Sequence, residues 1–150
     1  MSVANKVKYV IGEKNKKRAD LASELGISGQ AVSNKFVRDS FSTNDLIKIA
    51  NFLGVTLAFV DGNKVAITFE TTEAKCGNKI KYMLGDKGKN RSELATAFGI
   101  SRQAINSKFI RDSFSAYDLI KIAEFLGVTL ALVDGDKIAI AFDASDISER

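Results

Sequence analysis

The chain has 150 residues, 45% hydrophobic and 27% charged, a balance typical of a folded globular protein rather than a disordered one. It has no histidine and one cysteine, which excludes an internal disulfide, a zinc site built from histidine and cysteine, and histidine-based acid–base catalysis. It also has no apolar run near the roughly 18 residues of a membrane span, and no nucleotide-binding or serine-hydrolase motif. We therefore expect a cytoplasmic protein that is not an enzyme and that has no metal, cofactor, membrane or small-molecule partner.

The sequence is a tandem duplication. Residues 5–70 align with residues 78–143 without a gap, and about 42 of the 66 aligned pairs are identical. The repeat is longer than the roughly 20–50 residues of solenoid units, so two copies predict two small domains. We place the first domain at residues 1–70, a short linker at 71–77, the second domain at 78–143 and a tail at 144–150.

The net charge of +4 is unevenly distributed along the chain. Residues 1–54 contain 9 Lys and Arg against 5 Asp and Glu, and residues 78–127 contain the same numbers. The remaining segments are acidic in total. The positive charge therefore lies in the same part of each copy.

Four helices are predicted in the first copy, where apolar residues recur at helical spacing. Ser28 is the predicted N-cap of the third helix, and Ser42 with Asp45 forms a capping-box pattern before the fourth. Gly26 and Gly54 follow the second and fourth helices as C-terminal caps. These signals predict helices at about 3–14, 18–25, 29–37 and 43–53.

The apolar period then changes to two. Two β-rich runs flank Asp61-Gly62-Asn63, which predicts a β-hairpin. Alternation places the larger side chains on one face, toward the helices: Leu57, Phe59, Val65, Ile67 and Phe69 in the first copy, and Leu130, Leu132, Ile138, Ile140 and Phe142 in the second. Two alternatives stay open for the strand edges. The two hairpins pair with each other in one four-stranded sheet, or hairpins of different chains pair and give a dimer or a filament.

The second and third predicted helices, with the turn between them, resemble the helix-turn-helix of the lambda-repressor/Cro-like (XRE-type) family. The resemblance covers residues 6–55 and 79–128 and rests on "LASELGISGQAVSNKF" and "LATAFGISRQAINSKF". Both stretches have an alanine in the second helix, a turn glycine and an apolar residue after it, and the family's usual following helix resembles "DLIKIANFLGV" and "DLIKIAEFLGV". The resemblance implies a mainly α fold with a small β part: two tandem four-helix helix-turn-helix domains, each followed by a β-hairpin, with double-stranded DNA as the partner.

In such a motif the third helix lies in the DNA major groove and its first residues reach the base edges. The resemblance therefore implies base contacts by Gly29, Gln30, Ser33, Asn34, Arg102, Gln103, Asn106 and Ser107. Arg102 is suited to guanine whereas its counterpart Gly29 is not, so we expect the two copies to read related but non-identical half-sites. Phosphate contacts are expected from Lys17, Arg18, Ser28, Lys35, Arg38, Arg91, Ser101, Lys108 and Arg111.

The predicted function is that of a sequence-specific, DNA-binding transcriptional regulator with two recognition helices in one chain. Two alternatives remain open at this point. One is an architectural, DNA-coating or filament-forming protein with low sequence specificity, whose chains associate through the hairpin edges. The other is an antirepressor-like protein-interaction module that keeps the scaffold without binding DNA. Drift on a solvated surface is a further explanation for the polar differences between the copies.

Overall fold

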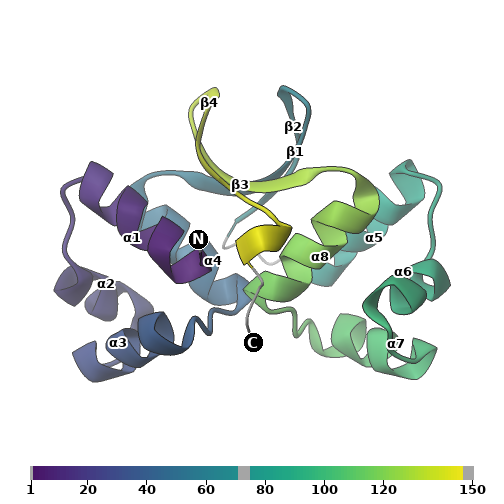
Figure 1. The fold of residues 1–150 in the computed structure, drawn as a ribbon, viewed down its shortest axis with the longest axis horizontal. Coiled ribbons are helices and arrows are strands. Elements are labelled where there is room, and N and C mark those ends of the chain that lie inside the picture. Colours follow the sequence, from purple (N-terminus) through teal and green to yellow (C-terminus); the bar gives the residue numbers. More distant parts are fainter. Residues whose placement is uncertain (1, 71–74, 147–150) are drawn as a thin grey trace.

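The computed structural model describes residues 2–70 and 75–146, and in it each copy folds as four helices followed by a β-hairpin (Figure 1). The first copy comprises α1 (Val3–Glu13), α2 (Arg18–Leu25), α3 (Gly29–Arg38), α4 (Thr43–Leu53), β1 (Thr56–Asp61) and β2 (Lys64–Phe69). The second comprises α5 (Cys76–Asp86), α6 (Arg91–Phe98), α7 (Arg102–Arg111), α8 (Ala116–Leu126), β3 (Thr129–Asp134) and β4 (Lys137–Phe142), followed by the short 3-10 helix η1 (Ala144–Asp146). None of the described helices is long and apolar enough to cross a membrane.

The predicted helix caps are confirmed. The Ser28 hydroxyl accepts a hydrogen bond from the Ala31 N–H at 3.0 Å, and the side chains of Ser42 and Asp45 form a reciprocal capping box. Gly26 ends α2 in the left-handed conformation at φ 71°, where a side chain would be strained. The first-copy helices therefore begin and end close to where these local signals placed them.

The four strands form one antiparallel sheet in the order β2-β1-β3-β4, so the two hairpins pair with each other within the chain. Ala58 of β1 lies opposite Ala131 of β3, and Ser42 forms an isolated bridge with Ser115. Both pairs join equivalent positions of the two copies. An approximate twofold axis therefore passes through both pairs, and the copies are related like the subunits of an isologous dimer.

The prediction that Val65 and Ile138 face the helices was wrong. The register shifts between Phe59 and Val60, so that Val65 lies opposite Val60, and the same shift in the other hairpin places Ile138 opposite Val133. Directly opposed residues share a face of the sheet, so both side chains lie on the face away from the helices. They are 47% and 49% exposed. A β-bulge takes up one extra residue, and strict alternation along the sequence does not reveal it.

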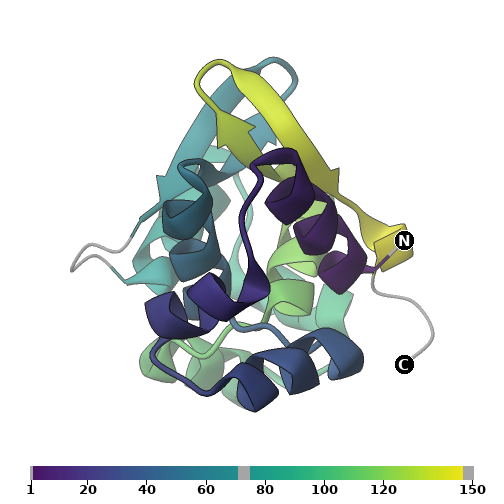
Figure 2. The ribbon, with the colours of Figure 1, turned by 90° about the vertical axis from the view of Figure 1, so that its left-hand side faces the viewer.

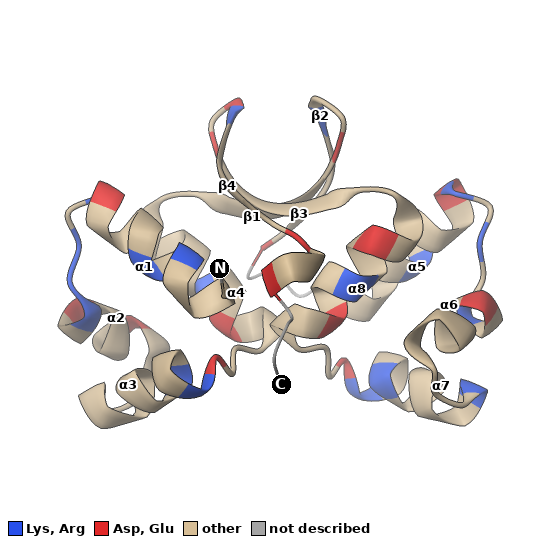
Figure 3. Ribbon diagram, in the orientation of Figure 1, with Lys and Arg blue, Asp and Glu red and all other residues tan. Residues whose placement is uncertain are grey.

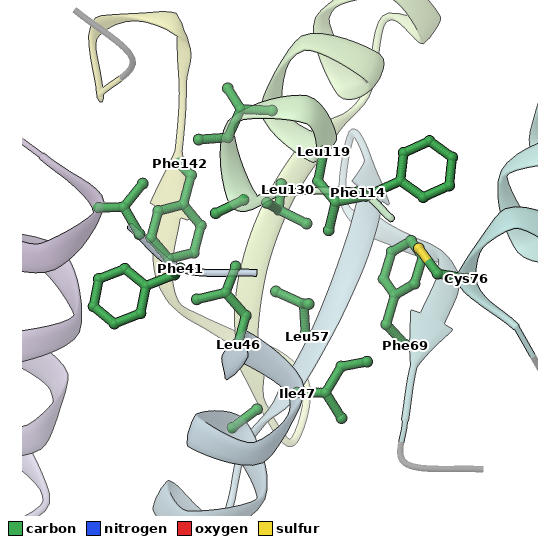
Figure 4. Close-up of a cluster of buried hydrophobic side chains, with 14 of the residues drawn as sticks. Phe41, Leu46, Ile47, Leu57, Phe69, Cys76, Phe114, Leu119, Leu130 and Phe142 are labelled. Carbon is green, nitrogen blue, oxygen red and sulfur yellow. The ribbon is translucent and has the colours of Figure 1, made fainter. Parts of the chain in front are cut away.

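One hydrophobic core runs through both copies (Figure 4). Leu57 and Leu130, from the two central strands, are both 0% exposed and lie in the same cluster as Leu46 of α4 and Leu119 of α8. Each copy's first helix packs on the other copy's hairpin, α1 against β4 and α5 against β2. The repeats are thus separate in sequence but share one interior, which separation would expose to water.

Two equivalent ion pairs follow the same crossed arrangement. Lys14 near the end of α1 lies 2.6 Å from Asp134 of the second hairpin, and the equivalent Lys87 lies 2.7 Å from Asp61 of the first. All four side chains are partly exposed, so each pair adds about 0–1 kcal/mol and mainly fixes where α1 and α5 lie.

The predicted linker and tail are partly structured. Residues 71–74 and 147–150 lie outside the described residues, but α5 begins at Cys76 and η1 holds a buried Asp146. Cys76 occupies the position equivalent to the buried Val3 of the first copy. Burial, and then the nearby charge of Asp112, raises the pKa of the Cys76 thiol to about 12. The thiol is therefore neutral at ordinary pH and takes the place of an apolar side chain.

Candidate nucleic-acid interface

The helix-turn-helix of each copy presents one face of its third helix outward. In α3, Val32 and Phe36 are buried at 2% and 5% exposure and fix the inner face of the helix. The turn before it is closed by Gly26, and Ile27 packs against the core. The second copy repeats this arrangement with α6 and α7. We call α3 and α7 the recognition helices.

The predicted base-contacting residues lie on the outer side of these two helices. In α3 all four are exposed: Gly29, Gln30, Ser33 and Asn34. In α7, Arg102 and Gln103 are exposed, whereas Asn106 and Ser107 are half-buried. The structure therefore places each predicted set on one face of one helix. Asn106 and Ser107 are less accessible than their counterparts Ser33 and Asn34.

The two recognition helices lie on the same side of the molecule. They occupy the two ends of the side opposite the hairpin tips, and the view turned by 90° places them there as well (Figures 1 and 2). Because the twofold axis runs from the sheet through the Ser42–Ser115 bridge, it passes between the two helices.

Most predicted phosphate-contacting residues are exposed around the recognition helices: Lys17, Arg18, Ser28, Arg38, Arg91, Ser101 and Arg111. Lys35 and Lys108 differ. They are half-buried, and each pairs with a capping-box carboxylate, Asp45 at 2.8 Å and Asp118 at 2.9 Å. Their stems lie on the fold, and part of their charge is already balanced within the protein.

Arginine and lysine side chains beside the recognition helices lie over phenylalanine rings. The Arg18 guanidinium lies 5.1 Å from the centre of the Phe36 ring, and Arg91 lies 5.3 Å from the Phe109 ring. Figure 3 shows lysine and arginine residues, coloured blue, on and beside α3 and α7. Stacking of this kind holds a guanidinium in place while leaving its N–H groups free to donate.

Two further lysines beside these rings were not among the residues predicted to contact DNA. Lys8 and Lys81 lie 5.9 Å above the same Phe36 and Phe109 rings as the arginines. Both are exposed residues of the first helix of a copy. Their identity in the two copies was a signal in the sequence, but only packing of the first helix beside the third brings them to this surface.

The junction between the recognition helices breaks the symmetry. Tyr117, in the first turn of α8, donates a hydrogen bond to Asp39 at the end of α3, and the same carboxylate accepts the Ala4 N–H at 2.6 Å. In the second copy, Asp112 accepts the N–H groups of Cys76 and Gly77 instead. Both aspartates thus hold the start of a first helix against a recognition helix, and Tyr117 adds a link across the two copies.

A hollow of about 380 Å³ opens at the same junction. Its lining includes Ser42, Asn44, Arg111 and Ser115, from both copies. Arg111, the last residue of α7, therefore also borders the space between the recognition helices.

Comparison with known protein families gives a repeated match. The model of the bacteriophage CI repressor helix-turn-helix domain matches residues 5–64 and, separately, residues 80–137. Together the two matches cover well over half of the chain. Each includes the helix-turn-helix, the fourth helix and the first strand of its copy. Comparisons with curated proteins and with solved structures gave no match.

Proposed function

Because the chain belongs to the bacteriophage CI repressor helix-turn-helix family, we propose that it is a sequence-specific transcriptional regulator that binds one DNA site through α3 and α7 of a single chain. The observation that carries this proposal is the placement of two exposed, polar recognition helices on one side of the molecule. Relatives with one helix-turn-helix would need two chains to present such a pair. Here the covalent connection and the shared core supply it, and the second helix binds at high effective concentration.

The approximate twofold axis predicts the arrangement of the DNA site. Equivalent residues meet at Ala58–Ala131 and at Ser42–Ser115, so the recognition helices are related by rotation rather than by translation. Two surfaces related in this way read an inverted repeat. We expect two inverted half-sites whose centres lie about one helical turn, roughly 34 Å, apart.

The differences between α3 and α7 make this repeat imperfect. Arg102 is exposed at the start of α7 and presents two parallel donors to guanine O6 and N7, which is worth about 1–3 kcal/mol of discrimination. Gly29 has no side chain for this contact, while Gln30 and Gln103 are both suited to adenine. The half-site read by α7 therefore contains a guanine preference that the other lacks, and the protein binds its site in one orientation.

Phosphate contacts supply the affinity that does not depend on sequence. Arg18, Arg38 and their counterparts Arg91 and Arg111 flank the recognition helices and are exposed. Neutralising phosphates releases counterions, so binding weakens steeply as salt rises. Lys35 and Lys108 contribute less than the arginines because each already has a carboxylate partner.

Selection from a randomised duplex pool, followed by titration of the enriched duplex at several salt concentrations, tests this function. We expect a two-part inverted motif whose halves differ. Arg102→Ala should remove the guanine preference in one half only. Lys64→Ala, at an exposed lysine of β2 beside the hairpin tip, is the control and should leave the motif unchanged.

The other outcomes assign the chain to a different class. Tight, salt-sensitive binding without any enriched motif identifies an architectural DNA-coating protein. Absence of binding at low salt, together with a stable protein partner, identifies a protein-interaction module built on the same scaffold.

A further inference from the structure

Among the described residues, Val37 and Ile110 are the most exposed large hydrophobic side chains, at 84% and 74%. They occupy equivalent positions near the ends of α3 and α7. Both are branched aliphatic residues. A single exposed aliphatic side chain is ordinary on a protein surface. This position, however, keeps a branched aliphatic residue in both copies, while the exposed Gly29, Ser33 and Asn34 are replaced in the second copy.

Helix geometry places Val37 on the base-reading face. It follows Gln30 by seven residues and Asn34 by three, which is two turns and one turn along the same side of α3. The buried residues Val32 and Phe36 face the opposite way. Ile110 has the same relation to Gln103 and Ser107 in α7. The apolar side chains therefore continue the row of predicted base contacts.

We propose that Val37 and Ile110 read thymine by packing on its C5-methyl group, with one such contact in each half-site. The thymine methyl is the apolar group that the major groove presents, and the other base-edge groups there are hydrogen-bond donors and acceptors. This inference rests on the proposed function. It adds an apolar, sequence-reading contact to a surface on which only polar contacts were predicted.

The surroundings of the two residues favour DNA as the partner over a protein. Val37 is followed by Arg38 and Ile110 by Arg111, and both arginines are exposed. Exposed arginines next to these apolar side chains suit a surface that meets a groove bordered by phosphates.

Methyl deletion on the DNA tests the contact directly. The probe is the duplex that the wild-type chain enriches from the randomised pool, with each dT replaced singly by dU. We expect at least one such replacement in each half-site to weaken wild-type binding about fourfold, the effect of losing one buried methyl group. Val37→Ser should bind the dT and dU forms of its half-site equally, and Ile110→Ser should do the same for the other half.

Matched variants separate this role from folding. Val37→Ile and Ile110→Val exchange the residues of the two copies and should keep the preference for dT. Val65→Ser, at an exposed valine of the β2 strand, should leave every dT-to-dU ratio unchanged. Circular dichroism should show the wild-type fold for all variants, because none of the substituted side chains is buried.

Three results overturn the inference. The first is an enriched motif whose dU forms all bind like the dT forms; sequence-specific binding then stands and only the methyl contact fails. The second is a Val37→Ser/Ile110→Ser variant that retains the wild-type preference for dT, or that changes only self-association in sedimentation. The third is a pool with no enriched motif, which overturns the proposed function as well.

Discussion

The recognition helices α3 and α7 have the same buried face and different exposed faces. Phe36 corresponds to Phe109, and Val32 to Ile105, all buried at 5% or less. On the outer side, Gly29 is replaced by Arg102, and Ser33-Asn34 by Asn106-Ser107. Packing tolerates few changes in the interior, whereas an exposed position can change at little cost to folding. A duplicated chain can therefore acquire two different outer surfaces while it keeps one fold.

The junction of the copies shows a second difference. Tyr117 reaches Asp39 across the axis, whereas its first-copy equivalent is the shorter Asn44. Two identical subunits would repeat any contact on both sides of the axis. A covalent pair is free of that constraint, so each side of its interface can hold a different contact.

Truncation in the shared core should have the largest effect. Leu57→Ala or Leu130→Ala should each lower the free energy of unfolding by about 2–5 kcal/mol, because both leave a cavity at a fully buried site. Urea unfolding followed by circular dichroism should show one transition for either variant, since both leucines belong to one core. Val65→Ala, at an exposed site, is the control. Two separate transitions would show that the copies unfold independently.

The second-largest expected effect is a change in DNA specificity when the two recognition helices are made alike. Gly29→Arg should add a guanine preference of about 1–3 kcal/mol to the half-site read by α3 and make the enriched motif more symmetric. The fold should tolerate this change, because a Cβ atom at Gly29 has nothing within 4 Å. Repeated selection from the randomised pool measures the effect. An unchanged motif would contradict the assignment of this position to base reading.

Removing the asymmetric link should have a smaller effect. Tyr117→Phe deletes the hydroxyl that donates to Asp39, and it should lower the free energy of unfolding by about 1–2 kcal/mol. Urea denaturation is the measurement. Tyr9→Phe, at a tyrosine that is 55% exposed, serves as the comparison and should change stability little. Equal effects of the two substitutions would show that the Tyr117 hydroxyl adds nothing specific.

The smallest expected effect concerns the start of α2. Asn90 caps α6 and forms a capping box with Glu93, whereas the equivalent Lys17 makes no side-chain capping bond to α2 in the described structure. Lys17→Asn should therefore raise the free energy of unfolding by about 0.5–1 kcal/mol, and Asn90→Lys should lower it by a similar amount.

The same Lys17→Asn variant also tests a phosphate contact. If Lys17 contacts DNA, its loss should reduce the slope of log binding constant against log salt by about one. A more stable protein with an unchanged salt slope would remove Lys17 from the set of DNA contacts.

The local features were predictable because they depend on neighbours in the chain. The Ser28 cap, the Ser42–Asp45 box and the turn at Gly26 are short-range hydrogen bonds and backbone preferences that residue types specify. The exposed row on α3 followed from helical spacing once the helix was placed. Val37 was not predictable as a surface residue of this row from its type, because valine is usually buried; the fold leaves its side chain 84% exposed.

By itself, the sequence determined the duplication, the order of helices and hairpins, and the residues on each helix face, since these depend on periodicity and capping. Only the tertiary structure decided that the hairpins pair within the chain, that a bulge turns Val65 outward, and that both recognition helices face one side. The hairpin pairing and the placement of the recognition helices arise from contacts such as Ala58–Ala131, whose partners are distant in the chain. The bulge arises within one hairpin, where alternation along the sequence does not reveal it. Local propensity does not specify such contacts. Several arrangements satisfy every local signal, and burial of one shared core selects among them.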